Sequence, residues 1–216
     1  MKEKIIKAKN IYNEFNISLY SGLVFGIAFT MYNIYLGISE KLIWNISFGI
    51  YYIFLTLAKL FTLKEYNKAS KHNREYSFKT FILVSVIIIL LTLAMIGPAW
   101  LMIKNKRSVN VGTIHSITIA AYTFTKLGVA IYNMIKYRLE FTLFNLSKVN
   151  IHINQALVSI LTLQNTLIYT FETDNKNLLP LTIASSNLIL IIMIIITIIT
   201  LKKGINYHNS AKLSEI

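Results

Sequence analysis

The chain has no cysteine, only 2 prolines and 8 glycines in 216 residues, and few charged side chains, at 14%. Without cysteine, disulfides and thiolate metal sites are excluded, and the redox compartment stays open. A soluble domain carries about 25% charged residues. The low charge here accompanies 55% hydrophobic residues and a mean hydropathy of +0.55. This composition indicates a polytopic membrane protein.

Acidic residues are the scarcer charge, with 9 Asp and Glu against 22 Lys and Arg, for a net charge of +13. The basic residues lie mostly between apolar segments, where they set topology and meet anionic lipid headgroups, so we expect no nucleic-acid partner. All acidic residues lie outside the apolar segments. Acid–base catalysis by carboxylates within the membrane is therefore not expected, and we expect neither enzyme activity nor a bound metal or cofactor.

Six apolar segments are each about 20 residues or longer, enough to cross about 30 Å of hydrocarbon as a helix. They predict an all-α bundle of six transmembrane helices, in one domain that covers residues 1–216. The predicted spans are residues 17–38, 43–63, 78–103, 112–135, 149–171 and 178–201.

The lysines and arginines are divided unequally between the two sides of these spans. With Lys79, at the start of the third span, counted in the second loop, 15 fall in the two terminal tails and in the second and fourth loops, and 5 fall in the other loops. Since basic loops stay cytoplasmic, both termini are predicted to be cytoplasmic. Heavy use of Ile, Lys and Asn is typical of low-GC coding, which favours a bacterial cell membrane as the location.

The fourth predicted span carries a lysine, Lys126, near its midpoint, and we expect this helix to organise the bundle. At about 100° per residue, His115, Tyr122, Lys126 and Asn133 fall on one face. An ionisable group at that depth costs at least a few kcal/mol and marks a candidate functional site. No acidic residue shares its depth; Glu14, just before the first span, is the nearest candidate partner. Snorkelling to the headgroups, a cavity or ligand site, and a structural hydrogen bond to a neighbouring helix all remain open for Lys126.

The fifth predicted span carries a second polar stripe, expected to face the fourth. Its members follow one another at three- and four-residue steps: His152, Gln155, Ser159, Thr162 and Thr166. These groups either bond across helices, at about 0.6 kcal/mol each, or line a cavity. His152 and His115 are predicted near opposite membrane faces, so they are not expected to share a metal.

The two stripes together suggest a site for a small anionic solute in the cytoplasmic half of a transporter or binding protein. Lys126 would supply the charge. The candidate ligand-binding residues are Tyr122, Lys126, Asn133, Gln155 and Ser159. Lys59 is expected to snorkel instead, because it lies only four residues from the end of the second predicted span.

Small residues recur every four positions in the first predicted span, at Ser18, Gly22, Gly26 and Thr30. This pattern lets helix backbones approach closely, either within the chain or against a partner subunit. The second reading gives an alternative function. The chain would be a non-catalytic accessory or assembly subunit that binds another membrane protein or anionic lipid, for example the substrate-binding subunit of a modular uptake transporter.

The run from Ala120 to Phe124, AAYTF, with Lys126 two residues on, resembles a family of small six-span bacterial membrane proteins without an assigned activity. The likeness continues from Ala156 to Gln164 and covers mainly the fourth and fifth spans. At Thr125 the family usually has an aromatic residue. The resemblance implies that the two striped helices form one unit, and it implies no activity.

Overall fold

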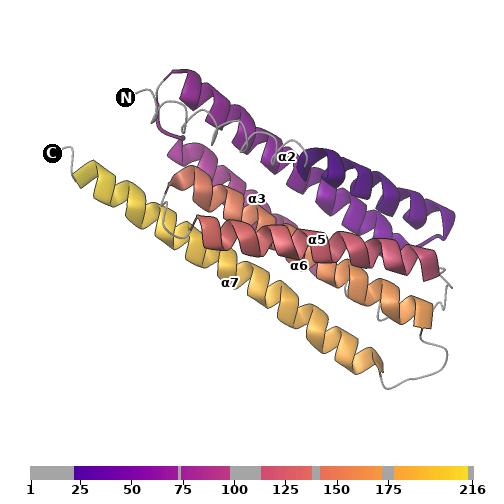
Figure 1. Cartoon of the computed structure of the whole chain (residues 1–216). Helices are drawn as coiled ribbons and strands as arrows, with labels where there is room; N and C mark the ends of the chain where they lie inside the picture. The colour runs from indigo at the N-terminus through magenta and orange to yellow at the C-terminus, as the bar shows by residue number, and fades with distance from the viewer. Residues whose placement is uncertain (1–21, 73, 98–112, 138–141, 172–177, 214–216) are drawn as a thin grey trace.

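A computed structural model describes residues 22–72, 74–97, 113–137, 142–171 and 178–213 (Figure 1). These ranges are helical and contain no strand, which confirms the all-α prediction. The long elements are the N-terminal helix Gly22–Ser39, α2 (Ile43–Lys71), α3 (Phe78–Ala94), α5 (Thr113–Lys136), α6 (Leu143–Phe171) and α7 (Leu178–Leu213).

Four described helices are long and apolar enough to cross a membrane: Gly22–Ser39, α2, α5 and the part Ile183–Leu213 of α7. The described helix α3 is apolar but has 17 residues. The predicted third span continues to residue 103, and residues 98–103 lie outside the described part, as do residues 17–21 of the first span. Helix α6 has 29 residues but is not among these four, and amides, hydroxyls and a histidine recur along it.

Helix α6 lies at the centre of the bundle. It packs against α5, α7, α2 and α3, whereas α5 packs against α6 on one side and exposes Phe124 and Ile131 on another. The expectation that α5 organises the bundle is therefore wrong. Its buried polar residues lie on one face, and Thr118 and Thr125 are exposed, whereas polar groups on several faces of α6 are buried by protein around it.

The N-terminal helix and α2 form a tight antiparallel hairpin, in which Gly37 lies against Ile46 and Gly49 against Ile34. The small face of the first helix also points inward, and Gly26 and Thr30 are both buried. The chain itself covers these two residues, which favours packing within the chain at Gly26 and Thr30. Ser18 lies outside the described residues.

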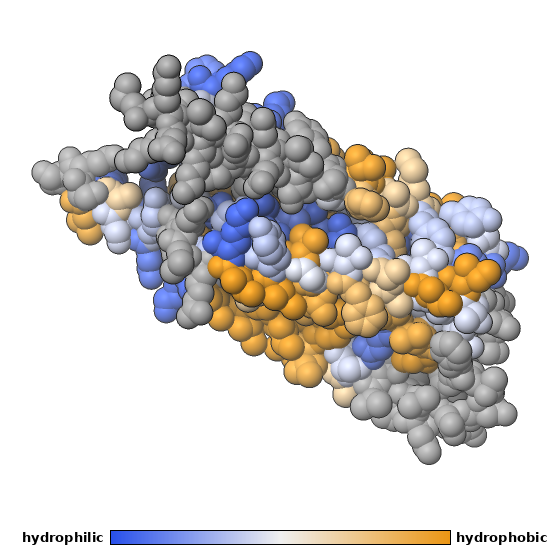
Figure 2. Space-filling model, viewed as in Figure 1, coloured by the Kyte–Doolittle hydropathy of each residue, from blue (hydrophilic) through white to orange (hydrophobic). Residues whose placement is uncertain are grey.

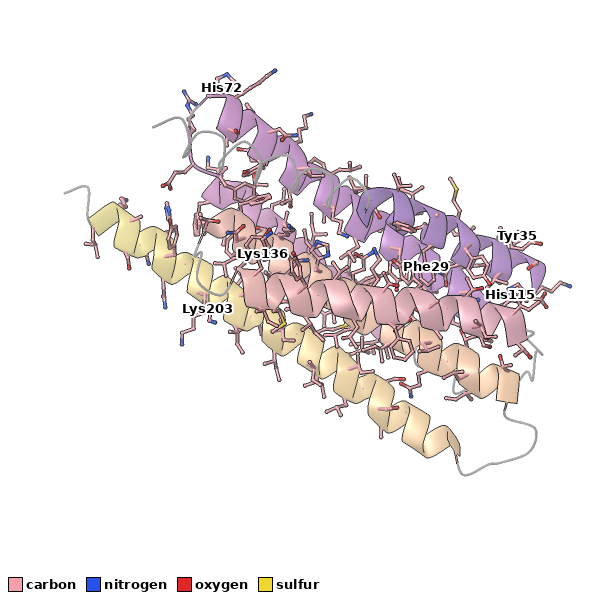
Figure 3. All side chains as sticks on the ribbon, viewed as in Figure 1. Phe29, Tyr35, His72, His115, Lys136 and Lys203 are labelled. Atoms are coloured by element: carbon pink, nitrogen blue, oxygen red, sulfur yellow. The ribbon has the colours of Figure 1, made fainter. Side chains whose placement is uncertain are left out.

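The two ends of the bundle differ in charge. His72, Lys136 and Lys203 lie at one end, and Tyr35 and His115 lie toward the other (Figure 3). We call the first the basic end. Exposed basic residues of the described part at this end are Lys64, Lys68, Lys71, Arg74, Lys79, Lys136, Lys202, Lys203 and Lys212. Between the ends, Figure 2 shows a largely hydrophobic surface on the face that carries α5 and α7.

Candidate functional site

Two buried lysines from different helices meet in one polar group inside the bundle. Lys59 of α2 is 3% exposed, and its Nζ donates to Oε1 of Gln155 on α6 at 2.5 Å. Nε2 of Gln155 donates to the Tyr122 hydroxyl of α5 at 3.0 Å. Lys126, 6% exposed, places its Nζ 5.1 Å from the centroid of the Tyr122 ring. We call Lys59, Tyr122, Lys126 and Gln155 the lysine cluster.

The lysine cluster contains no carboxylate. The acidic residues of the described part are Glu40, Glu65 and Glu75, and none of them forms an ion pair with Lys59 or Lys126. The charges close enough to act on Lys59 are instead positive. A buried cation without an opposite charge is unfavourable, and a like charge beside it adds to the cost.

Aromatic rings fix the position of Tyr122. Phe29 of the N-terminal helix stacks on it with ring centroids 3.5 Å apart and planes 5° from parallel. Tyr52 of α2 meets both rings edge-on, at 5.1 Å from Phe29 and 6.2 Å from Tyr122. Rings from the N-terminal helix and α2 therefore hold the Tyr122 ring of α5 in place. This fixes the ring face beside Lys126 and the hydroxyl that accepts from Gln155.

The polar face of α6 extends the cluster toward the basic end. Lys148 and His152 precede Gln155 at four- and three-residue steps, so the three side chains share one face. His152 is 4% exposed, and its Nε2 has no hydrogen-bond partner among the described residues. Lys59, Lys126 and Lys148 all lie close enough to His152 for their charges to act on it. Lys148 itself donates to the Tyr137 hydroxyl at 3.0 Å.

The structure brings together three of the five predicted site residues: Tyr122, Lys126 and Gln155. Asn133 and Ser159 are also buried, but they bond to their own helices. Nδ2 of Asn133 donates to the Val129 carbonyl at 2.8 Å, and Oγ of Ser159 donates to the Ala156 carbonyl at 2.7 Å. Their polar side chains serve helix packing in this structure.

Lys59 is the residue that sequence reasoning placed wrongly, since its amine points inward and not to the headgroups. The reason is that Gln155 of α6 accepts a hydrogen bond from this amine inside the bundle, a partner that the position of Lys59 along its span does not reveal. The sequence did contain a sign that Lys59 faces other helices. Thr56, Lys59 and Thr62 recur at three-residue steps, which places a polar stripe on one face of α2.

The small face of the N-terminal helix covers the cluster. A Cβ atom on Gly22 would lie 3.9 Å from Nζ of Lys59, and one on Gly26 would lie 3.7 Å from Nε2 of Gln155. The glycines therefore leave the lysine–glutamine pair without a side chain above it. Nearer the other end, the Tyr32 hydroxyl and Nδ1 of His115 lie 2.5 Å apart and join the same helix to α5.

No protein-family description, curated protein or solved structure matches the chain. The proposals below rest on the residues of the chain itself.

Proposed function

We propose that the protein crosses the bacterial cell membrane six times, with both termini in the cytoplasm, and binds a small anionic solute at the lysine cluster. The observation that carries the proposal is that Lys59 and Lys126 are buried together without a described carboxylate to neutralise them. A solute anion would supply the missing charge. The proposed role is binding or transport, and it includes no catalytic step.

The cluster offers donors suited to an anion. The two amines supply charge, and the Tyr122 hydroxyl and the Gln155 amide can each donate one further hydrogen bond. In an apolar surrounding such charge-assisted bonds are shorter and stronger than neutral ones. Phe29 and Tyr52 complete an aromatic wall beside the donors, an arrangement common in small-molecule sites.

Lys126→Met should abolish stabilisation by the solute. For the purified full chain, we expect one or more small anions from a panel of phosphate, sulfate, acetate and succinate to raise the thermal unfolding temperature. Ligand that binds the folded state alone adds stability of about 2.7 kcal/mol at 100 times its Kd. The variant should lose that rise, because the buried charge is gone.

Lys136→Met is the matched control, since Lys136 is a lysine of the same helix but is exposed. It should respond to the anion as the unaltered chain does. If no anion in the panel stabilises the unaltered chain, the proposed function is wrong. If Lys126→Met responds normally, the site has been misplaced.

The orientation can be tested directly, because the chain has no cysteine of its own. A single cysteine at the exposed position of Lys41 should react with a membrane-impermeant maleimide on intact cells. One at Lys68, on the basic end, should react only after permeabilisation. The reverse pattern would overturn the proposed topology. The same basic end is where we propose contact with anionic headgroups.

A further inference from the structure

Each lysine of the cluster has a neutral partner in this structure. The amine of Lys59 bonds to the amide oxygen of Gln155, and the amine of Lys126 faces the ring of Tyr122. Each contact gives the amine a polar or aromatic neighbour, but neither neighbour carries a negative charge. The two amines reach the cluster from separate helices, α2 and α5, and they approach it through the opposite ends of the Gln155–Tyr122 pair.

A buried imidazole with an unpaired nitrogen lies beside the two amines. His152 lies one helical turn from Gln155 on the same face of α6, with a buried Nε2 that has no partner among the described residues. A protein seldom leaves such an atom unpaired without a ligand, ion or water to pair it. A single negative charge would neutralise one lysine and leave the other as costly as before.

We propose that the solute carries two negative charges on oxygen atoms, one for Lys59 and one for Lys126. This inference rests on the proposed function above and names its substrate class. Inorganic phosphate or sulfate and a short dicarboxylate share this chemistry. An anionic oxygen takes the place of Oε1 of Gln155 at Lys59, and a second one meets Lys126 beside the Tyr122 ring.

Gln155 is the exchangeable partner in this scheme. Its amide group keeps Lys59 hydrogen-bonded while the site is free. When the anion arrives, the side chain needs only to rotate its amide so that Nε2 donates to the ligand. The backbone of the N-terminal helix packs closely over this amide, since a Cβ atom on Gly26 would lie 3.7 Å from Nε2 of Gln155.

The test compares dianions with monoanions that carry the same kind of anionic group, on the purified full chain. Inorganic phosphate is paired with dimethyl phosphate, and succinate with acetate, at equal ionic strength and at a pH where phosphate is mainly doubly charged. The dianion of at least one pair should stabilise the chain at a concentration about tenfold lower than its monoanion. Preference for the phosphate pair or the succinate pair identifies the source.

Variants separate this inference from the proposed function. Lys59→Met and Lys126→Met should each weaken dianion binding by about tenfold or more. Each should reduce the preference for two charges, whereas Lys136→Met should keep it. If both members of each pair bind equally well, anion binding stands and the two-charge inference falls. If no anion binds, both fall. The comparison of ligands uses the unaltered chain, so it decides the question even where a variant fails to fold.

Discussion

Gln155→Leu is expected to lower the free energy of unfolding by about 3 kcal/mol. Oε1 of Gln155 accepts from Nζ of Lys59 at 2.5 Å, and Nε2 of Gln155 donates to the Tyr122 hydroxyl at 3.0 Å. The substitution removes both hydrogen bonds. Both groups would stay inside the bundle without that partner. Thermal and denaturant unfolding of the purified chain in detergent would measure the loss.

Gln164→Leu is the matched control. Gln164 is also on α6 and bonds to a single neutral hydroxyl, that of Ser185 on α7, at a half-buried position. Its removal should cost roughly 1 kcal/mol, the usual net value for one neutral hydrogen bond. If both leucine variants lose the same free energy of unfolding, the lysine cluster contributes no more to stability than an ordinary hydrogen bond.

Gln155→Glu should have the opposite effect, because a carboxylate of nearly the same shape would give Lys59 the counter-charge it lacks. We expect a higher unfolding temperature than that of the unaltered chain. We also expect no response to added anions, since the new carboxylate occupies the position of the ligand oxygen. A glutamate variant that unfolds as early as the leucine variant would count against a positively charged site.

Gly37→Ala should destabilise the hairpin of the N-terminal helix and α2 by about 2 kcal/mol. A Cβ atom on Gly37 would lie 2.5 Å from Cγ1 of Ile46 and 2.8 Å from its backbone nitrogen. A side chain can change rotamer to relieve such a contact, but the backbone nitrogen cannot. The two helices would have to separate, and Phe29 would lose its register against Tyr52.

Gly128→Ala provides the comparison, since no heavy atom lies within 4 Å of its added Cβ. Alanine favours a helix interior over glycine by about 1 kcal/mol, so this variant should be neutral or slightly more stable. Unfolding temperatures of the two alanine variants decide the matter. If both variants unfold at the same temperature, the hairpin is less tightly packed than the distances imply.

The helices were predictable because apolar runs of spanning length leave few alternatives, but their ends were not. Helix α2 was predicted to end at residue 63 and α7 at residue 201, whereas they continue to Lys71 and Leu213. Hydropathy marks the apolar part of a helix, and lysine- and glutamate-rich turns extend it further.

Part of the candidate site followed from helix periodicity. The spacing of Tyr122 and Lys126 placed them on one face, and the stripe on the next helix supplied Gln155. Lys59 was misplaced because its distance from the end of the predicted span does not show that its amine meets Gln155 of α6. The central position of α6 was missed because the sequence does not show how many neighbours a helix has; the polar groups buried on several of its faces accompany that position.

The polarity of α6 also bears on how the protein is made. Within the proposed topology, a helix with buried asparagines at positions 145, 150, 154 and 165 would have to shed the hydration of each amide to enter lipid by itself. A neighbour lowers that barrier in part, because Thr197 of α7 bonds to both Asn150 and Asn154. Biogenesis of this chain is then a cooperative event, in which α6 leaves the translocation machinery for the bilayer only once flanking helices have gathered around it.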